Sequence, residues 1–191
     1  MNQNLLLAPQ LNTDFTGNRI LNQLLLAGFG ILLLAVLAQV AIPVPFSPVP
    51  ITGQTLGVLC LGLLYGRKLG LTTILGYIAL GSIGLPLFAK GGSGLLFFSP
   101  SGGYLIGYIF AVVVSGYLAE KGWTKSSGKL LLTMLIAEAF IYAFGLLQLS
   151  FFIPSETVLS AGLYPFIMGD LIKMALVALI LPLGWKLKKS L

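Results

Sequence analysis

Long apolar stretches, separated by short polar or proline- and glycine-rich segments, make up most of this chain. The first covers residues 20–42 and ends where four closely spaced prolines forbid a helix, at Pro43, Pro45, Pro48 and Pro50. Five more follow at about residues 54–65, 69–85, 103–119, 130–152 and 163–185. A helix crosses a bilayer with about 20 apolar residues. The pattern therefore predicts an all-α integral membrane protein with six transmembrane helices.

The second stretch, residues 54–65, is short for a membrane span. A short apolar segment after a proline-rich one is a common way to build a binding site from broken helix inside a membrane. Alternatively, this helix begins earlier, near Pro50.

Composition supports a membrane location. Of 191 residues, 57% are hydrophobic and 8% charged, and the mean hydropathy is +1.00. Residues 1–19 are polar and lack the apolar core of a secretory signal, so we expect a cytoplasmic N-terminal tail before a single domain at 20–191. No basic run is interleaved with aromatic residues, which argues against nucleic acid as a partner.

The basic residues predict the topology. With six spans and a cytoplasmic N-terminus, the cytoplasmic side receives nine of the 11 Lys and Arg residues, whereas Lys90 lies outside and Lys173 lies within the last span. This asymmetry favours a plasma-membrane protein with both termini in the cytoplasm. The nine are Arg19, Arg67, Lys68, Lys121, Lys125, Lys129, Lys186, Lys188 and Lys189.

Several kinds of chemistry are excluded. The chain has no His and a single cysteine, Cys60, so it cannot assemble a zinc site or a His-containing catalytic triad. It also lacks the glycine-rich phosphate loop of nucleotide hydrolases. We therefore expect no catalytic residues, metal or cofactor, and any nucleotide-driven transport must use the ATPase of a partner.

Three ionisable residues fall inside predicted spans: Glu138, Asp170 and Lys173. Each is costly in a bilayer unless it is paired or hydrated. Asp170 and Lys173 are three residues apart on one helix face, in its outer half, where they can form a structural ion pair or anchor a small amide-bearing or zwitterionic ligand. Glu138 lies nearer the cytoplasm, as a structural residue or a partner contact.

Two outer loops could complete a binding site. The segment 43–54 is apolar but cannot be helical in its proline-rich part, and it would project the amide of Gln54 into the membrane interior. In 99–104, Gly102 and Gly103 would let backbone approach a ligand, and Tyr104 would offer a flat face and a hydroxyl. Lys90 lies in a third outer loop, either simply solvated or attracting an anionic solute.

These segments resemble the BioY family, the biotin-binding S component of energy-coupling-factor (ECF) transporters. The similarity covers nearly the whole chain after residue 20 and rests on four motifs: P-V-P-F-S-P-V-P-I-T-G-Q-T-L at 43–56, G-L-P-L-F-A at 84–89, S-P-S-G-G-Y-L-I-G-Y at 99–108 and G-D-L-I-K at 169–173.

The resemblance implies a six-helix S-component fold that binds biotin and works with a transmembrane coupling subunit and two cytoplasmic ATPase subunits. It places Asp170 at a ureido N–H and Lys173 at the ureido carbonyl or the carboxylate. Gln54, Tyr104 and the glycines 102 and 103 would complete the site.

The family also implies a small-residue face on the first helix for docking the coupling subunit. Here the small residues are Ala35, Ala38 and Ala41, spaced by three rather than four. Two alternative functions stay open at this point. The chain could bind another small vitamin, or it could be a membrane-embedded enzyme that uses Glu138 or Asp170 as a general acid or base.

Overall fold

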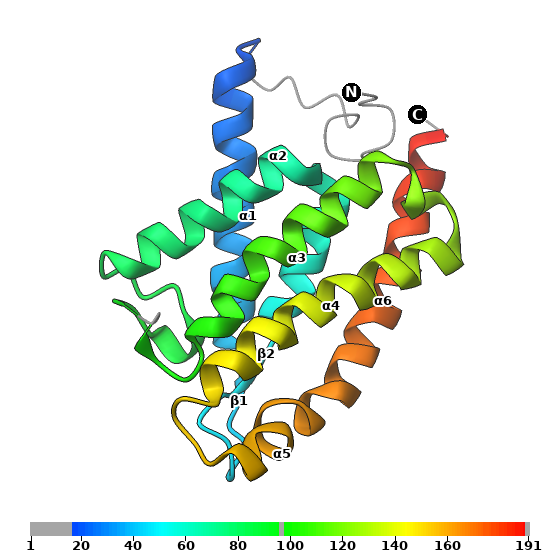
Figure 1. The fold of residues 1–191 in the computed structure, drawn as a ribbon. Helices are drawn as coiled ribbons and strands as arrows, with labels where there is room; N and C mark the ends of the chain where they lie inside the picture. Colours follow the sequence, from blue (N-terminus) through cyan, green and yellow to red (C-terminus); the bar gives the residue numbers. More distant parts are fainter. Residues whose placement is uncertain (1–16, 96–97, 190–191) are drawn as a thin grey trace.

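The structure, a computed structural model, describes residues 17–95 and 98–189, and for 182–189 it describes the backbone only. The predicted tail therefore lies, up to residue 16, outside the described residues. The main helices are α1 (Arg19–Gln39), α2 (Gln54–Ser82), α3 (Gly102–Glu120), α4 (Ser127–Leu149) and α6 (Tyr164–Lys189), with the short α5 (Val158–Gly162) before α6. Figure 1 shows these helices packed as a bundle.

The remaining elements are small. A hairpin of β1 (Ala41–Ile42) and β2 (Ile51–Thr52) joins α1 to α2, and 3₁₀ turns form at Ala89–Gly91, Trp123–Lys125 and Ser155–Thr157. The prediction of an all-α protein is thus confirmed apart from this hairpin. Within the described residues, five helical segments are long and apolar enough to cross a membrane, so the sixth predicted span is not confirmed.

The difference arises at Gly66, inside α2. The spans predicted at 54–65 and 69–85 form one helical element that breaks at this glycine, whose φ of 76° lies in the left-handed region. In Figure 1 the first part of α2 rises from β2 towards the end of the bundle where α1 begins, and the second part runs back from there. A methyl group on Gly70 would lie 3.4 Å from the Leu61 carbonyl oxygen, so the two parts are folded against each other.

The end of α3 holds this break in place. The backbone N–H of Arg67 donates to Oε1 of Glu120 at 2.9 Å, which satisfies a helix N-terminus with an acidic group. Gly116 lies so close to the bend that a methyl group there would be 2.5 Å from the Arg67 backbone nitrogen. Gly116 thus allows the end of α3 to pack closely against the bend of α2.

The proline-rich segment is not helical, as predicted from its four prolines. The strands pair antiparallel, with Ala41 opposite Thr52 and Ile42 opposite Ile51. Val44 and Val49 of the connecting loop are buried, and the Gly53 N–H donates to the Leu37 carbonyl at 3.1 Å. The loop is therefore fixed to the end of α1, and it sets where α2 begins.

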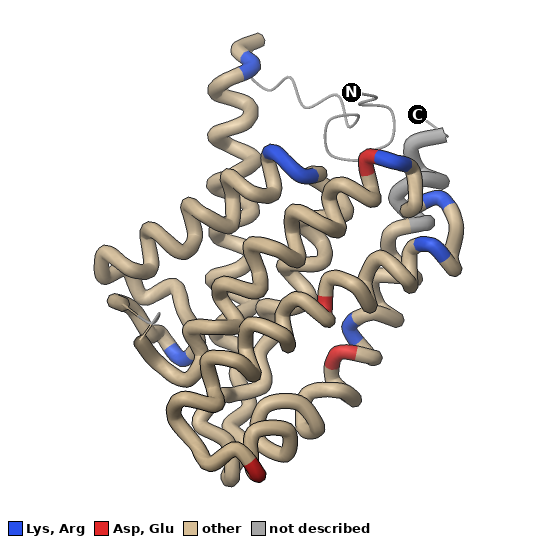
Figure 2. Tube along the Cα trace, viewed as in Figure 1, with Lys and Arg blue, Asp and Glu red and all other residues tan. Residues whose placement is uncertain are grey.

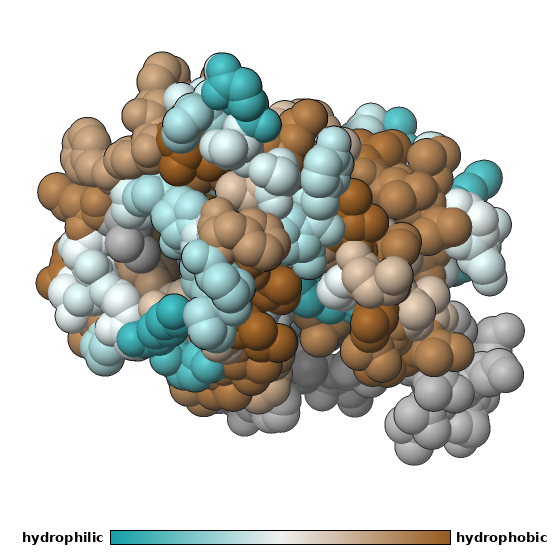
Figure 3. Space-filling view, turned by 90° about the horizontal axis from the view of Figure 1, so that it is seen from below, coloured by the Kyte–Doolittle hydropathy of each residue, from teal (hydrophilic) through white to brown (hydrophobic). Residues whose placement is uncertain are grey.

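The core lies between α2, α3 and α4, where α3 packs against both neighbours. Its most buried side chains include Leu59, Tyr77, Val112, Met134 and Ile141. By contrast, α1 and α6 expose large apolar side chains to the outside, among them Phe29 and Leu179. Such exposed apolar surface is expected of helices that face lipid. Figure 3, a view onto the end that carries the hairpin, shows pale and hydrophilic surface flanked by apolar surface.

The three alanines predicted as a docking face do not form one exposed stripe. Ala38 is fully buried, Ala35 is half-buried, and Ala41 lies in β1, beyond the end of α1. The reason is geometric: with about 3.6 residues per turn, a three-residue step drifts around the helix instead of keeping one face. A role of these alanines in docking a coupling subunit stays a prediction.

Charged positions are distributed unevenly along the bundle (Figure 2). Basic positions gather where α1 begins, at the bend of α2 and at the connection from α3 to α4. These three places lie towards the same end of the molecule in Figure 1, opposite the hairpin. The side chains of Lys186, Lys188 and Lys189, which entered the topology prediction, lie outside the described residues.

Candidate binding cavity

A cavity of about 220 Å³ lies at the hairpin end of the bundle. It is enclosed by the 43–54 loop, the first turn of α2, the turn at Ala89–Gly91 and residues of α3, α4 and α6. Most of the residues on its wall are apolar or aromatic, and polar groups lie between them. The polar and charged residues on the wall are Thr52, Gln54, Thr55, Lys90, Ser101, Tyr104, Tyr108, Tyr142, Asp170 and Lys173.

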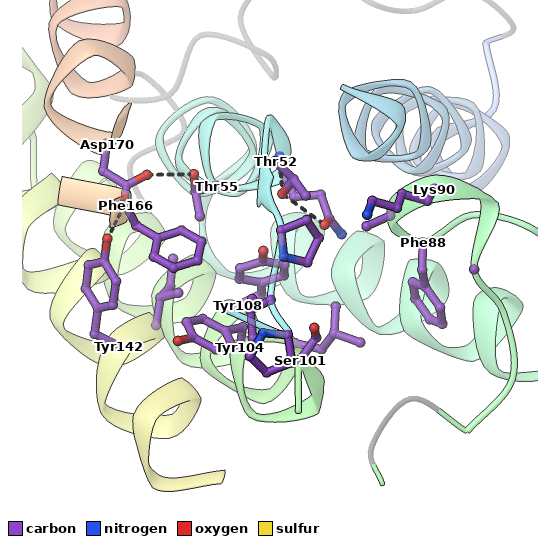
Figure 4. A pocket seen from close by; sticks show the side chains of 18 of the residues that line it. Thr52, Thr55, Phe88, Lys90, Ser101, Tyr104, Tyr108, Tyr142, Phe166 and Asp170 are labelled. Atoms are coloured by element: carbon purple, nitrogen blue, oxygen red, sulfur yellow. Dashed lines mark hydrogen bonds between the residues drawn. The ribbon is translucent and has the colours of Figure 1, made fainter. Parts of the chain in front are cut away.

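Asp170, on α6, is the centre of a hydrogen-bonded cluster at one side of the cavity (Figure 4). Its Oδ1 accepts from the Thr55 hydroxyl at 3.1 Å and from Lys173 Nζ at 2.9 Å, and its Oδ2 accepts from the Tyr142 hydroxyl. Lys173 Nζ also donates to Thr55 Oγ1 at 2.7 Å. Asp170 is only 4% exposed, and burying its charge costs free energy. The three hydrogen bonds, from donors on three helices, offset this cost.

Gln54 is held by a second set of hydrogen bonds at the start of α2. Its Nε2 donates to the Tyr77 hydroxyl at 2.8 Å, and its Oε1 accepts from the Thr52 hydroxyl at 3.1 Å. Tyr77 in turn donates to the Leu87 carbonyl at 2.8 Å. The Gln54 side chain is therefore oriented by the protein before any ligand is present.

Aromatic side chains form the wall between the two sides of the cavity. Figure 4 shows Tyr104, Tyr108 and Ser101 lying between the Asp170 cluster and Lys90. The Tyr104 hydroxyl donates to the Gly162 carbonyl at 2.7 Å, and its ring lies 6.2 Å from that of Phe166, centroid to centroid. Because the Tyr104 hydroxyl is already bonded, its contribution to the cavity is chiefly the face of the ring.

Lys90 lies across the cavity from Asp170 (Figure 4). It is the one described non-glycine residue with positive φ, at 57°, in the 3₁₀ turn Ala89–Gly91. Gln39 of α1 holds this turn: its Nε2 donates to the Phe88 carbonyl at 3.2 Å, and its Oε1 accepts from the Gly91 N–H at 2.9 Å. Lys90 therefore belongs to the cavity wall, although it is exposed to solvent.

The structure brings four of the six predicted binding residues together on this wall: Gln54, Tyr104, Asp170 and Lys173. The other two, Gly102 and Gly103, do not line it. A methyl group on Gly103 would collide with the Phe144 carbonyl oxygen of α4, so this glycine allows α3 and α4 to pack closely. Ser101, the residue before them, lines the cavity instead.

Sequence reasoning missed several wall residues, of which Thr55 and Tyr142 matter most for polar contacts, and it left Lys90 open between a solvated loop residue and one that attracts an anionic solute. Thr55 follows Gln54 directly, and its role as a bridge between Asp170 and Lys173 depends on the contact between α2 and α6. Tyr142 lies one helical turn after the buried Glu138 on α4, which was a signal for a polar face of that helix. Aromatic residues in apolar spans, such as Tyr108 and Phe166, gave no comparable signal.

Comparison with known proteins agrees with this architecture. The family model described as "BioY family" matches residues 7–190. A protein of Thermotoga maritima named "Biotin transporter BioY" is 38% identical over 167 residues, covering 84% of this chain and 94% of the relative. A protein of the same name from Lactococcus lactis subsp. cremoris is 37% identical over 146 residues, covering 73% of this chain and 77% of the relative.

A solved structure has the same fold. It is the crystal structure at 2.1 Å of "the S-component for biotin from an ECF-type ABC transporter", with a TM-score of 0.78 and 34% sequence identity. The match covers 87% of this chain and 92% of that one. Together with the family match over nearly all residues, this shows that the chain belongs to the BioY family.

Proposed function

We propose that this chain is the biotin-binding membrane subunit of an ECF transporter and mediates biotin uptake. Membership of a family of transport proteins, relatives named as biotin transporters, and likeness to an S component for biotin support this function. They also agree with the expectation that the chain is not an enzyme. The observation that carries the proposal is the buried Asp170, presented by three hydrogen-bond donors at the wall of an apolar cavity.

The cavity fits the chemistry of biotin. Biotin has a ureido group with two N–H donors and one carbonyl, an apolar thioether ring and chain, and a carboxylate at the far end. An apolar pocket with a few well-placed polar anchors suits such a molecule. The Asp170 carboxylate accepts a ureido N–H, and the aromatic wall that includes Tyr104 and Phe166 contacts the ring system.

The two lysines take opposite ends of the ligand. Lys173 lies beside Asp170, so its ammonium group donates to the ureido carbonyl and not to the carboxylate. Lys90 lies across the cavity, where it pairs with the biotin carboxylate. Gln54, held by Thr52 and Tyr77, contributes a polar group between the two ends.

The chain crosses the plasma membrane six times, with both termini in the cytoplasm. This topology counts the two parts of α2 as separate spans joined at the Gly66 break. It places Arg19, Arg67, Lys68 and the 121–129 connection on the cytoplasmic side, as the distribution of Lys and Arg in membrane proteins favours. The cavity then opens towards the outside, where biotin is captured.

Uptake against a gradient needs a transmembrane coupling subunit and two cytoplasmic ATPase subunits. The sequence has no phosphate-binding loop with which to use ATP itself. The partners therefore supply the energy, and this chain supplies the selectivity.

Isothermal titration of the purified protein in detergent tests the proposed substrate. We expect saturable binding of biotin and no binding of thiamine or riboflavin, which lack a ureido ring fused to a thioether ring. Mass spectrometry of the protein as purified should find retained biotin. Binding of another vitamin in place of biotin would overturn the substrate assignment and leave the membrane-subunit function standing.

A further inference from the structure

Glu138 is a buried acidic residue that the cavity wall does not include. It lies on α4, one helical turn before Tyr142, and is only 4% exposed. Neither of its carboxyl oxygens has a hydrogen-bond partner among the described residues. A charged carboxylate with no partner is strongly disfavoured in such a place, and this burial favours the protonated form of Glu138.

The groups that interact electrostatically with Glu138 are polar residues of the cavity wall. Asp170 and Lys173 of α6 interact with it electrostatically, as do Tyr108 of α3 and Tyr142 of its own helix. Tyr77 of α2 interacts electrostatically with Tyr108. Figure 2 likewise shows a charged position on α4 in the middle of the bundle, near the charged positions of α6.

Oδ1 of Asp170 has no acceptor site left before a ligand arrives, because two donors already share it. Thr55 and Lys173 occupy Oδ1, and Tyr142 occupies Oδ2. A ureido N–H that binds Oδ1 must replace Thr55 or Lys173. Of these two donors, Lys173 is the one that also interacts with Glu138, whose carboxyl oxygens are both free of partners among the described residues.

We infer that Glu138 is a positioning residue for Lys173 and that ligand binding releases its proton. The ligand N–H takes the place of Lys173 at Asp170. Lys173 then donates one N–H to the ureido carbonyl and another to the carboxyl group of Glu138. The O–H bond of the Glu138 carboxyl breaks, its proton leaves to water, and the carboxylate pairs with the ammonium group, which keeps all its protons. This step rests on the proposed function in biotin binding.

Proton release gives a direct test. Titration of biotin into the detergent-purified protein, at one pH in two buffers of different ionisation enthalpy, measures the protons exchanged per ligand bound. We expect about one proton released by the unmodified protein and none by Glu138→Gln. Glu156→Gln, which removes an exposed carboxylate from an outer turn, should release the same number as the unmodified protein.

The pH dependence must agree with this count. Because binding releases a proton, biotin affinity should rise with pH, by up to about tenfold per unit between roughly pH 6 and 8, where ordinary carboxyl groups such as that of biotin stay ionised. In Glu138→Gln the affinity should be lower and nearly independent of pH over this range.

An infrared measurement keeps the test independent of whether Glu138→Gln folds. The difference spectrum of the unmodified protein, with biotin minus without biotin, should show a negative band at the carbonyl stretch of a protonated carboxyl group. Biotin binding without proton release, proton uptake, or full release by Glu138→Gln would each overturn the role of Glu138. Absence of biotin binding by the unmodified protein would instead overturn the proposed function, on which the inference depends.

Discussion

At the scale of single residues, the site depends on how a charge is kept inside an apolar cavity. Asp170 and Lys173 are three residues apart on α6, and that spacing alone permits an ion pair. The structure adds Thr55 and Tyr142 from two other helices, so the Asp170 carboxylate is oriented from several directions. Such an arrangement is suited to exchanging one donor for a ligand without losing the others.

Replacing Asp170 with Asn should weaken biotin binding and leave the fold intact. A neutral amide is a poorer acceptor than a carboxylate, and a hydrogen bond to a charged group contributes about 1.5–3 kcal/mol, so we expect roughly a tenfold to hundredfold loss of affinity. Calorimetry and thermal unfolding in detergent would be measured on the same sample, with Glu156→Gln as the control for loss of an acidic charge. Unchanged affinity would mean that Asp170 and Lys173 form only a structural ion pair.

Replacing Lys90 with Gln should affect only ligands that carry the carboxylate. The interaction is partly exposed to solvent, so we expect a loss of about 0.5–1 kcal/mol, or roughly twofold to fivefold in affinity for biotin. Biotin methyl ester, which has no charge at that end, should bind both proteins equally. An equal loss for biotin and its ester would show that Lys90 acts on the loop and not on the carboxylate. Gln keeps a Cβ, so the backbone strain at φ 57° is the same in both proteins.

At the scale of elements, the tight fold of α2 depends on glycines. Gly66 supplies the left-handed backbone at the break, Gly70 lets the second part lie against the first, and Gly116 of α3 lets the bend pack closely. Gly116 leaves room where the backbones of α2 and α3 meet, so the folded-back course of α2 and its contact with α3 are coupled.

Gly116→Ala should therefore destabilise the protein. Its methyl group would lie 2.5 Å from the Arg67 nitrogen, where backbone has little room to move, and overpacking of this kind costs about 1–3 kcal/mol. Thermal unfolding in detergent would show a lower midpoint. Gly128→Ala is the matched control, because nothing lies within 4 Å of the added methyl group on the exposed first turn of α4. A similar midpoint for both variants would show that the α2–α3 contact is looser than described.

At the scale of the whole molecule, the two ends of the bundle have different chemistry. One end carries the proline-rich hairpin and the cavity, and the other carries the bend of α2 and the connection from α3 to α4, with most of the described basic residues. A binding site at one end and positive charge at the other is the arrangement expected of a receptor that captures a solute outside the cell.

Cysteine labelling tests this orientation and the number of spans. In a Cys60→Ser background, Ser93→Cys should react with a membrane-impermeant thiol reagent on intact spheroplasts. Lys68→Cys and Ser127→Cys should react only after permeabilisation, because the proposed topology places both on the cytoplasmic side. Labelling of Lys68→Cys from outside would contradict the six-span topology, since it would place the α2 bend on the outer surface.

Reconstitution tests the energy source. Proteoliposomes that contain only this protein should bind biotin without accumulating it, whether or not a proton or sodium gradient is imposed. Adding the coupling and ATPase subunits with ATP should produce concentrative uptake. Accumulation by the single protein under an ion gradient would contradict the proposed dependence on partners.

The sequence by itself determined the elements and the class of chemistry. Helix-length apolar stretches bounded by proline, glycine and charge predicted the membrane helices, because burial in lipid requires backbone groups to bond within the helix. An intramembrane Asp and Lys at helical spacing marked α6 as carrying polar function, since such residues are costly elsewhere. The motifs around Gln54, Tyr104 and Asp170 indicated the family, and these residues do line one cavity.

Only the tertiary structure decided which residues meet. Thr55 and Tyr142 reach Asp170 because α2, α4 and α6 converge there, and Lys90 reaches the cavity because Gln39 holds its turn. The structure also assigned Gly103 to helix packing and buried Ala38, because the direction a small residue faces depends on its neighbours and not on its spacing alone. Contacts between distant segments depend on how the helices pack, and a linear pattern of apolar and polar residues carries little information about that packing.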